Sequence, residues 1–128
     1  MILILGARSD IAMAVAHRFA KAGYDIQLAA RDAENLADDK SDLELRYGVS
    51  ISLHEFDALE VQSHEVFVEN LCCLPTVVVC AVGYMGNQLE SENSIAATSI
   101  VMRSNFEGPA SILGVLANKF EQRGFACA

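Results

Sequence analysis

The segment with the clearest chemical potential follows the first apolar run of the chain. Residues 1–5 lead directly into Gly6-Ala7-Arg8-Ser9-Asp10-Ile11-Ala12, where a helical pattern begins. Gly6 provides the backbone freedom that a tight turn needs. The free N–H groups and positive dipole end of a helix starting here favour an anion such as a pyrophosphate. The residues expected at this anion site are Gly6, Arg8, Ser9, Asp10 and Ile11.

Two side chains qualify this interpretation. Ala12 is small enough to let helix and strand pack closely. The carboxylate of Asp10 lowers affinity for an anion unless it points away or pairs with Arg8. Asp10 also fits the first turn of any helix, where an acid is favourable, so this motif is only moderately specific.

The elements that position these residues are predicted from apolar periodicity. Two unbroken apolar runs and two alternating segments predict strands at residues 1–5, 25–30, 50–56 and 76–82. Helical spacing predicts helices at residues 10–22, 33–46, 61–74 and 94–122. Pro109 should bend the last helix or interrupt one turn. In the first helix, the expected apolar face consists of Ile11, Val15, Phe19 and Ala22.

Alternating strands and helices predict an α/β fold with a mainly parallel sheet. Strands covered on both faces are continuously apolar, which places the first and fourth in the centre and gives the order 3-2-1-4. This is a Rossmann-like, doubly wound sheet. Residues 124–128 look like the opening of a truncated fifth strand. We therefore expect one domain over residues 1–128, incomplete at its C-terminus.

The glycine turn resembles the G-x-x-x-G-x-G turn of short-chain dehydrogenases/reductases. Asp10 and Ala12 stand at the second and third glycine positions. The resemblance implies an NAD(P)(H)-binding region of an oxidoreductase that transfers hydride between the cofactor and a carbonyl or alcohol carbon.

Residues after the second strand bear on the choice of cofactor. An acid there holds the ribose 2′-OH of NAD, whereas NADP requires a cation for its 2′-phosphate. The chain has Ala29-Ala30-Arg31-Asp32, and Arg31 stands where NADP-preferring relatives carry an Arg. Arg8 is a second candidate phosphate contact, because Arg binds phosphate through a bidentate fork. We favour NADP(H) over NAD(H). The alternatives are a solvated Arg31 and an NAD-type acid displaced by one position to Asp32.

Three further segments match the family. Asp57 resembles the acid that accepts a hydrogen bond from the adenine amino group. The fourth strand ends in Cys80-Ala81-Val82-Gly83, where relatives carry Asn-Asn-Ala-Gly, and both Asn side chains of that motif are missing. Asn105, in Asn105-Phe106-Glu107-Gly108, resembles the Asn that supports the proton relay. Asn105 shares a helical face with Val101 and Ile112, so we expect its side chain to point into the protein.

The residues that would perform the chemistry are not present in the chain. The family's catalytic Tyr is followed four positions later by Lys, and a Ser positions the substrate carbonyl. Tyr24, Tyr47 and Tyr84 are followed at that spacing by Leu28, Ile51 and Gln88. Two hypotheses remain: the nucleotide-binding half of an enzyme, which is inactive by itself, or a complete non-catalytic nucleotide-binding or interaction module.

Composition limits the partners. A formal charge of −8 with scattered Lys and Arg argues against nucleic-acid and anionic-membrane binding. The four cysteines form no metal-binding pattern, and thiols reduced in the cytoplasm are expected. The five-residue apolar start is too short for a signal peptide. The last helix carries apolar residues on more than one face, as in the family's dimer interface, so we expect a homodimer or larger homo-oligomer.

Overall fold

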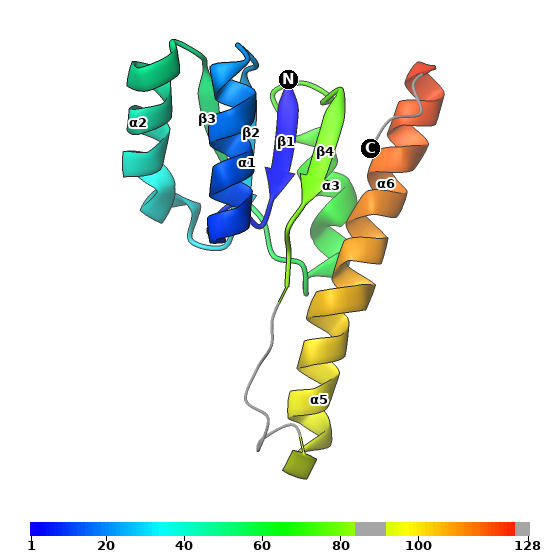
Figure 1. The fold of residues 1–128 in the computed structure, drawn as a ribbon. Coiled ribbons are helices and arrows are strands. Elements are labelled where there is room, and N and C mark those ends of the chain that lie inside the picture. Colours follow the sequence, from blue (N-terminus) through cyan, green and yellow to red (C-terminus); the bar gives the residue numbers. More distant parts are fainter. Residues whose placement is uncertain (84–91, 125–128) are drawn as a thin grey trace.

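A four-stranded parallel sheet forms the centre of the computed structural model, which describes residues 1–83 and 92–124. Its strands are β1 (Ile2–Leu5), β2 (Ile26–Ala30), β3 (Ile51–Glu55) and β4 (Val77–Cys80). Their order is β3-β2-β1-β4, which confirms the prediction (Figure 1). Ile2 is in register with Ile26 on one side and Val77 on the other. All four carboxyl ends therefore lie at the same edge of the sheet.

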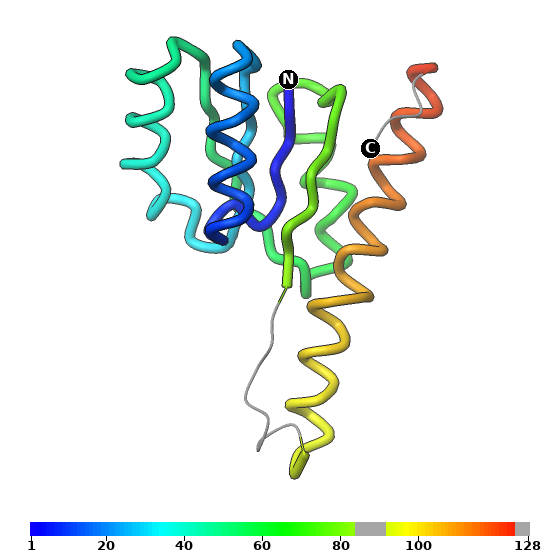
Figure 2. Tube along the Cα trace, viewed as in Figure 1, coloured from blue at the N-terminus to red at the C-terminus, as the bar shows by residue number. Residues whose placement is uncertain are grey.

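Helices cover both faces of the sheet (Figures 1 and 2). On one face lie α1 (Asp10–Lys21) and α2 (Ala37–Tyr47), the latter preceded by a 3₁₀ turn at Ala33–Leu36. On the other lie α3 (His64–Glu69), preceded by a 3₁₀ turn at Val61–Ser63, and α6 (Gly108–Arg123). Ile2, Ile4 and Leu28 face α1. Leu3, Leu5 and Ala29 face α3 and α6.

The buried face of α1 differs from the prediction. Ala12, Ala16 and Ala20 are buried, whereas Ile11 is 75% exposed. Three alanines at four-residue spacing let α1 approach the sheet closely, while Val15 and Phe19 of the predicted face are partly buried against the same core. The expected role of Ala12 in close packing is confirmed by its 0% exposure.

The third helix is shorter than expected. Residues 61–74 were predicted to be helical, but α3 ends at Glu69. The chain then turns, and the carbonyl oxygen of Cys73 accepts a hydrogen bond of 3.1 Å from Nε2 of Gln27. Gln27 is fully buried in β2 and needs such a partner. In a continued helix, the carbonyl oxygen of Cys73 would accept a hydrogen bond from the helix itself. In the observed turn it is free to accept one from Gln27.

The predicted long helix is present and is interrupted at one turn. It consists of α5 (Ile95–Met102), a π turn (Arg103–Glu107) and α6. Pro109 has no N–H, and its ring would clash with the carbonyl four residues earlier, which belongs to Asn105. Because the π turn contains Asn105, it accommodates the proline. Gly124 ends α6 at φ 87°, and the rest of the predicted fifth strand, residues 125–128, lies outside the described residues.

Within the described ranges, no helix is both long and apolar enough to cross a membrane.

Candidate functional site

A cleft of about 680 Å³ lies at the carboxyl ends of the strands. The chain passes from β1 to β2 and β3 on one side of the sheet, whereas β4 lies on the other side of β1. This change of direction makes the gap between β1 and β4 the topological switch point, where open α/β sheets bind ligands. The cleft is lined by Gly6, Arg8, Ser9, Ala30, Arg31, Phe56, Asp57, Ala58, Leu59, Ala81, Val82, Gly83, Ile100 and Ser104.

Gly6 forms the floor of the cleft beside the end of β4. Its φ is +79°, a left-handed conformation that favours glycine. A Cβ on Gly6 would lie 2.8 Å from the carbonyl carbon and oxygen of Ala81 and 2.9 Å from the nitrogen of Val82. The structure therefore brings together the glycine turn and the end of β4, both of which were expected to contact the cofactor.

The N-terminus of α1 is directed toward this turn. Ser9 caps the helix, and its Oγ accepts a hydrogen bond of 3.1 Å from the nitrogen of Ala12. The N–H groups of Asp10 and Ile11 have no acceptor within the helix because they lie in its first turn. The side chains of Asp10 and Ile11 are exposed and do not line the cleft. A role in binding would therefore belong to their backbone.

Arg8 forms an ion pair with Asp32 rather than with Asp10. Nη1 of Arg8 lies 3.8 Å from Oδ2 of Asp32, and both side chains are exposed. Asp32 has φ 51°, a left-handed conformation that Asp tolerates better than most residues. This pair places a cation and an anion together at the end of β2, while Arg31 lines the cleft beside them.

Glu55, at the end of β3, fixes this turn and was missed by the sequence analysis. Its two carboxylate oxygens accept hydrogen bonds from the nitrogens of Asp32, at 2.9 Å, and Ala33, at 3.0 Å. Both hydrogen bonds lower the pKa of Glu55, and the bond from Ala33 has the larger effect. The predicted strand order placed the end of β3 beside the end of β2, so a contact between Glu55 and the turn after β2 could have been predicted from it.

The loop after β3 forms the opposite wall. Oδ1 of Asp57 accepts a hydrogen bond of 2.9 Å from the nitrogen of Leu59. A Cβ on Gly108 would lie 2.5 Å from the carbonyl oxygen of Ala58, so only glycine permits this loop to approach α6 so closely. Nη2 of Arg103 donates to the carbonyl oxygen of Leu59 at 3.3 Å. The loop is therefore held against the long helix at several points.

The expected burial of Asn105 is wrong. Asn105 is exposed, and Ser104 is buried and lines the cleft. The π turn inserts one residue into the helical repeat, which rotates the inward position from Asn105 to Ser104. A Cβ on Gly83 would lie 3.6 Å from Oδ1 of Asn105, so the amide still lies close to the end of β4.

The remaining lining residues that sequence reasoning missed are mostly apolar. They are Ala30, Phe56, Ala58, Leu59, Ile100 and Ser104. Each lies within a few residues of a predicted site residue in sequence, except Ile100, which comes from α5. Their apolar character gives no chemical signal in the sequence. Among the described residues, no group of three or more His, Cys, Asp or Glu side chains could hold a metal ion.

Comparisons with known proteins agree with this geometry. No family model matches the chain. An uncharacterised oxidoreductase of Mycobacterium tuberculosis is 31% identical over 127 residues, which cover 96% of this chain and 50% of that protein. A short-chain dehydrogenase from Sphingobium yanoikuyae in complex with NADPH superposes with a TM-score of 0.77 at 21% identity, over 98% of this chain and 50% of that one. The chain is similar to the N-terminal half of short-chain dehydrogenases/reductases and shares their fold.

The match to this family covers the N-terminal half of its members. The alcohol dehydrogenase of the archaeon Thermococcus sibiricus, solved in complex with 5-hydroxy-NADP, is 26% identical with a TM-score of 0.77. That match covers 97% of this chain and 55% of the dehydrogenase. The chain thus spans about half the length of the short-chain dehydrogenases/reductases that it resembles.

Proposed function

We propose that the chain binds NADP(H) in this cleft as the nucleotide-binding part of a short-chain dehydrogenase/reductase. The observation that carries the proposal is the contact of Gly6 with Ala81 and Val82 at the switch point. Because Gly6 has no side chain, the floor of the cleft between the ends of β1 and β4 stays open. The N-terminus of α1 opens beside this floor, where backbone N–H groups and the helix dipole favour a pyrophosphate. Gly6, Ser9, Asp10 and Ile11 supply this backbone, and Ala81, Val82 and Gly83 supply the facing wall.

The cations beside β2 support NADP(H) rather than NAD(H). Arg8 and Arg31 both line the cleft. A guanidinium binds a 2′-phosphate through charge-assisted hydrogen bonds. Asp32, the residue that would favour NAD, is already paired with Arg8. The similar enzymes from Sphingobium yanoikuyae and Thermococcus sibiricus were solved with NADPH and 5-hydroxy-NADP, respectively.

The chemistry that we propose is that of the whole protein. When bound, the nicotinamide ring supplies or accepts a hydride, while a carbonyl or alcohol substrate exchanges the corresponding proton. The residues of this chain bind and orient the cofactor. Asn105, in the π turn with its amide close to the end of β4, supports the proton relay. The sequence contains no Tyr followed four positions later by Lys, so the acid–base residues would be supplied outside residues 1–128. Substrate recognition would also lie there.

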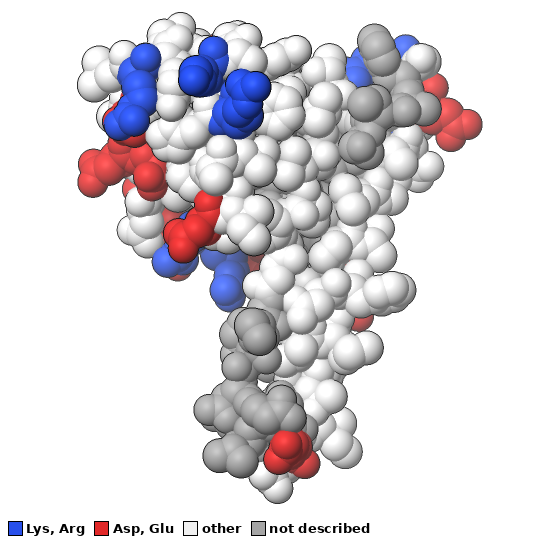
Figure 3. All heavy atoms as spheres, in the orientation of Figure 1, with Lys and Arg blue, Asp and Glu red and all other residues white. Residues whose placement is uncertain are grey.

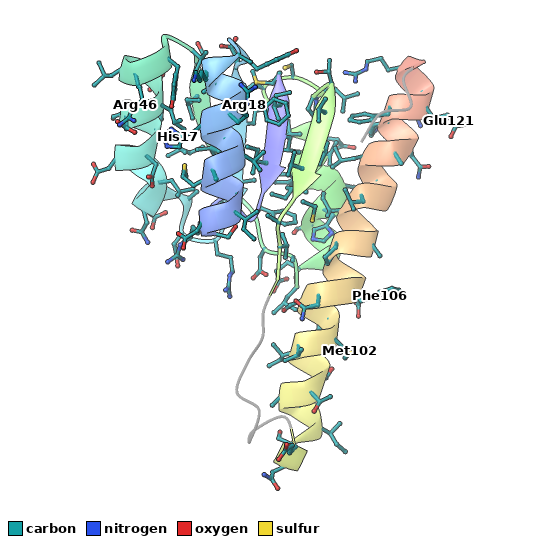
Figure 4. All side chains as sticks on the ribbon, viewed as in Figure 1. His17, Arg18, Arg46, Met102, Phe106 and Glu121 are labelled. Atoms are coloured by element: carbon teal, nitrogen blue, oxygen red, sulfur yellow. The ribbon has the colours of Figure 1, made fainter. Side chains whose placement is uncertain are left out.

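We further propose that the long helix forms a homo-oligomeric interface. Met102 and Phe106, on the part of the helix below the sheet in Figure 4, are 61% and 71% exposed. On the face shown in Figure 3, charged side chains gather over α1 and α2, while few cover α5 and α6. An apolar, weakly charged helix face favours association with another copy.

The free thiols of Cys72, Cys73 and Cys80 support a cytoplasmic location.

Calorimetric titration of the protein with NADPH and NADH tests the proposal. We expect saturable binding of both cofactors, with NADPH bound more tightly. 2′-Phospho-ADP-ribose should compete, because it contains the adenine, both riboses and the phosphates. If the folded protein binds neither cofactor, the proposed function is wrong.

A further inference from the structure

A fully buried histidine connects the cleft loop to the long helix. His64, the first residue of α3, is 0% exposed. Its Nε2 lies 3.1 Å from the carbonyl oxygen of Asp57, and its Nδ1 lies 2.8 Å from Oγ of Ser111 in α6. The imidazole also packs against Phe56, with ring centroids 5.1 Å apart and an interplanar angle of 30°. One side chain therefore connects the Phe56–Asp57 segment to α6.

The partners of His64 determine the arrangement of its hydrogens. A backbone carbonyl can only accept a hydrogen bond, so Nε2 must carry the hydrogen and donate it to Asp57. In the neutral ring, Nδ1 then accepts the hydrogen bond that the Ser111 hydroxyl donates. Both ring nitrogens are satisfied at a fully buried position, which makes the position of the ring well defined.

The loop that His64 holds is the wall of the cleft. Phe56, Asp57, Ala58 and Leu59 all line it. The contact of Ala58 with Gly108 limits how far the loop can move toward α6. The hydrogen bond from His64 acts on the backbone of Asp57 itself, and therefore fixes the point from which its carboxylate extends.

We propose that His64, oriented by Ser111, is the positioning residue that sets Asp57 for recognition of the purine 6-amino group, and that it thereby gives the cleft its preference for adenine. This inference rests on the proposed function. A carboxylate accepts a hydrogen bond from a 6-amino group but repels the 6-oxo oxygen of hypoxanthine. Selectivity between the two bases therefore depends on where the Asp57 carboxylate lies.

The test compares the Kd of NADPH with that of its hypoxanthine analogue, which differs only in the base. We expect wild type to prefer adenine about tenfold, the ratio that corresponds to about 1.4 kcal/mol. His64→Leu, which has no donor for the Asp57 carbonyl, should reduce the preference to within about twofold. His64→Gln, whose amide can donate to that carbonyl, should retain most of it. Val66→Ala, at an exposed position on the same helix, is the matched control.

Ser111→Ala keeps the test decisive if His64→Leu does not fold. Without the Ser111 hydroxyl the ring loses its orientation, and we expect a preference about two- to threefold lower than in wild type, with little change in Tm relative to Val66→Ala. A base preference in wild type that survives unchanged in folded His64→Leu or in Ser111→Ala overturns the assignment, as does a wild type that binds both analogues equally. A wild type that binds no dinucleotide contradicts the proposed function instead.

Discussion

Replacement of Arg31 by Ala tests the cofactor preference at the residue on which it mainly depends. Arg31 follows β2 directly, is exposed and lines the cleft. Its neighbours Asp32 and Ala33 are held by Glu55, so the backbone from which Arg31 extends is fixed by two hydrogen bonds. Loss of the guanidinium should therefore remove a charge without displacing the turn.

The expected magnitude follows from the exposure of this site. Two unit charges about 4 Å apart interact by about 1 kcal/mol in bulk water and about 4 kcal/mol near a protein surface. A hydrogen bond to a charged group contributes about 1.5–3 kcal/mol net of water. We therefore expect Arg31→Ala to weaken NADPH binding by about 10- to 150-fold. NADH has no 2′-phosphate, and its Kd should change by less than about twofold.

Calorimetry at about 0.1 M salt measures both constants, since at this ionic strength charges more than about 10 Å apart are largely screened. Arg46→Ala is the matched control: Arg46 is an exposed residue of α2, labelled in Figure 4, whose Nη2 lies 3.1 Å from Oδ1 of Asp42. It removes the same charge from a surface that does not line the cleft. An equal loss for both cofactors in Arg31→Ala, or no loss for either, would refute the reasoning.

Two further predictions concern stability. Gly108→Ala places a Cβ 2.5 Å from the carbonyl oxygen of Ala58 and should lower the free energy of unfolding by about 1–3 kcal/mol. Gly114→Ala, whose Cβ would have no neighbouring atom within 4 Å, should raise the free energy of unfolding by about 0.5–1 kcal/mol. Urea denaturation measures both values, and equal effects of the two substitutions would contradict the close contact at Gly108. Burial lowers the pKa of His54, so the neutral ring is favoured in the folded state: its contribution to stability is complete above its ordinary pKa of 6.5 and is lost as the pH falls through the lowered value. Urea midpoints between pH 8 and 5 should fall less steeply for His54→Asn than for wild type, and identical slopes would show that His54 is not responsible.

The sheet was predictable because its signals are local. Continuous apolar runs placed β1 and β4 side by side, and the carboxyl-edge location of Gly6, Arg31 and Asp57 followed from the strand order. Among the described strands, however, β4 lies at one end of the sheet, whereas β2, which was expected farther outward, is fully buried.

Sequence spacing identified which elements exist. It did not specify which face of a helix the fold uses, because that depends on how closely two elements approach. Three alanines of α1 pack on the sheet, Val15 and Phe19 of the predicted face pack beside them, and Ile11 of that face is exposed.

The errors at the site have the same origin. The inward position of Asn105 was expected from regular helical spacing, but within the π turn the inward residue is Ser104. Nothing in the spacing of apolar residues reveals a single inserted residue of this kind. His64 forms hydrogen bonds with Asp57 and Ser111, which lie 7 and 47 residues away in the sequence. Such partners become visible only when the chain is folded.

The π turn also divides one continuous helix into two parts of unequal thermodynamic character. α6 buries Ile112, Leu116 and Phe120 in the core, so opening it requires exposing that core. α5 has no buried residue, and an isolated helix of eight residues is marginal in water. The free energy needed to unwind α5 is therefore set by local helix formation, whereas that of α6 approaches the value for unfolding the whole domain. Ile100, on α5, lines the cleft, so one edge of the site belongs to a helix that opens more easily than α6.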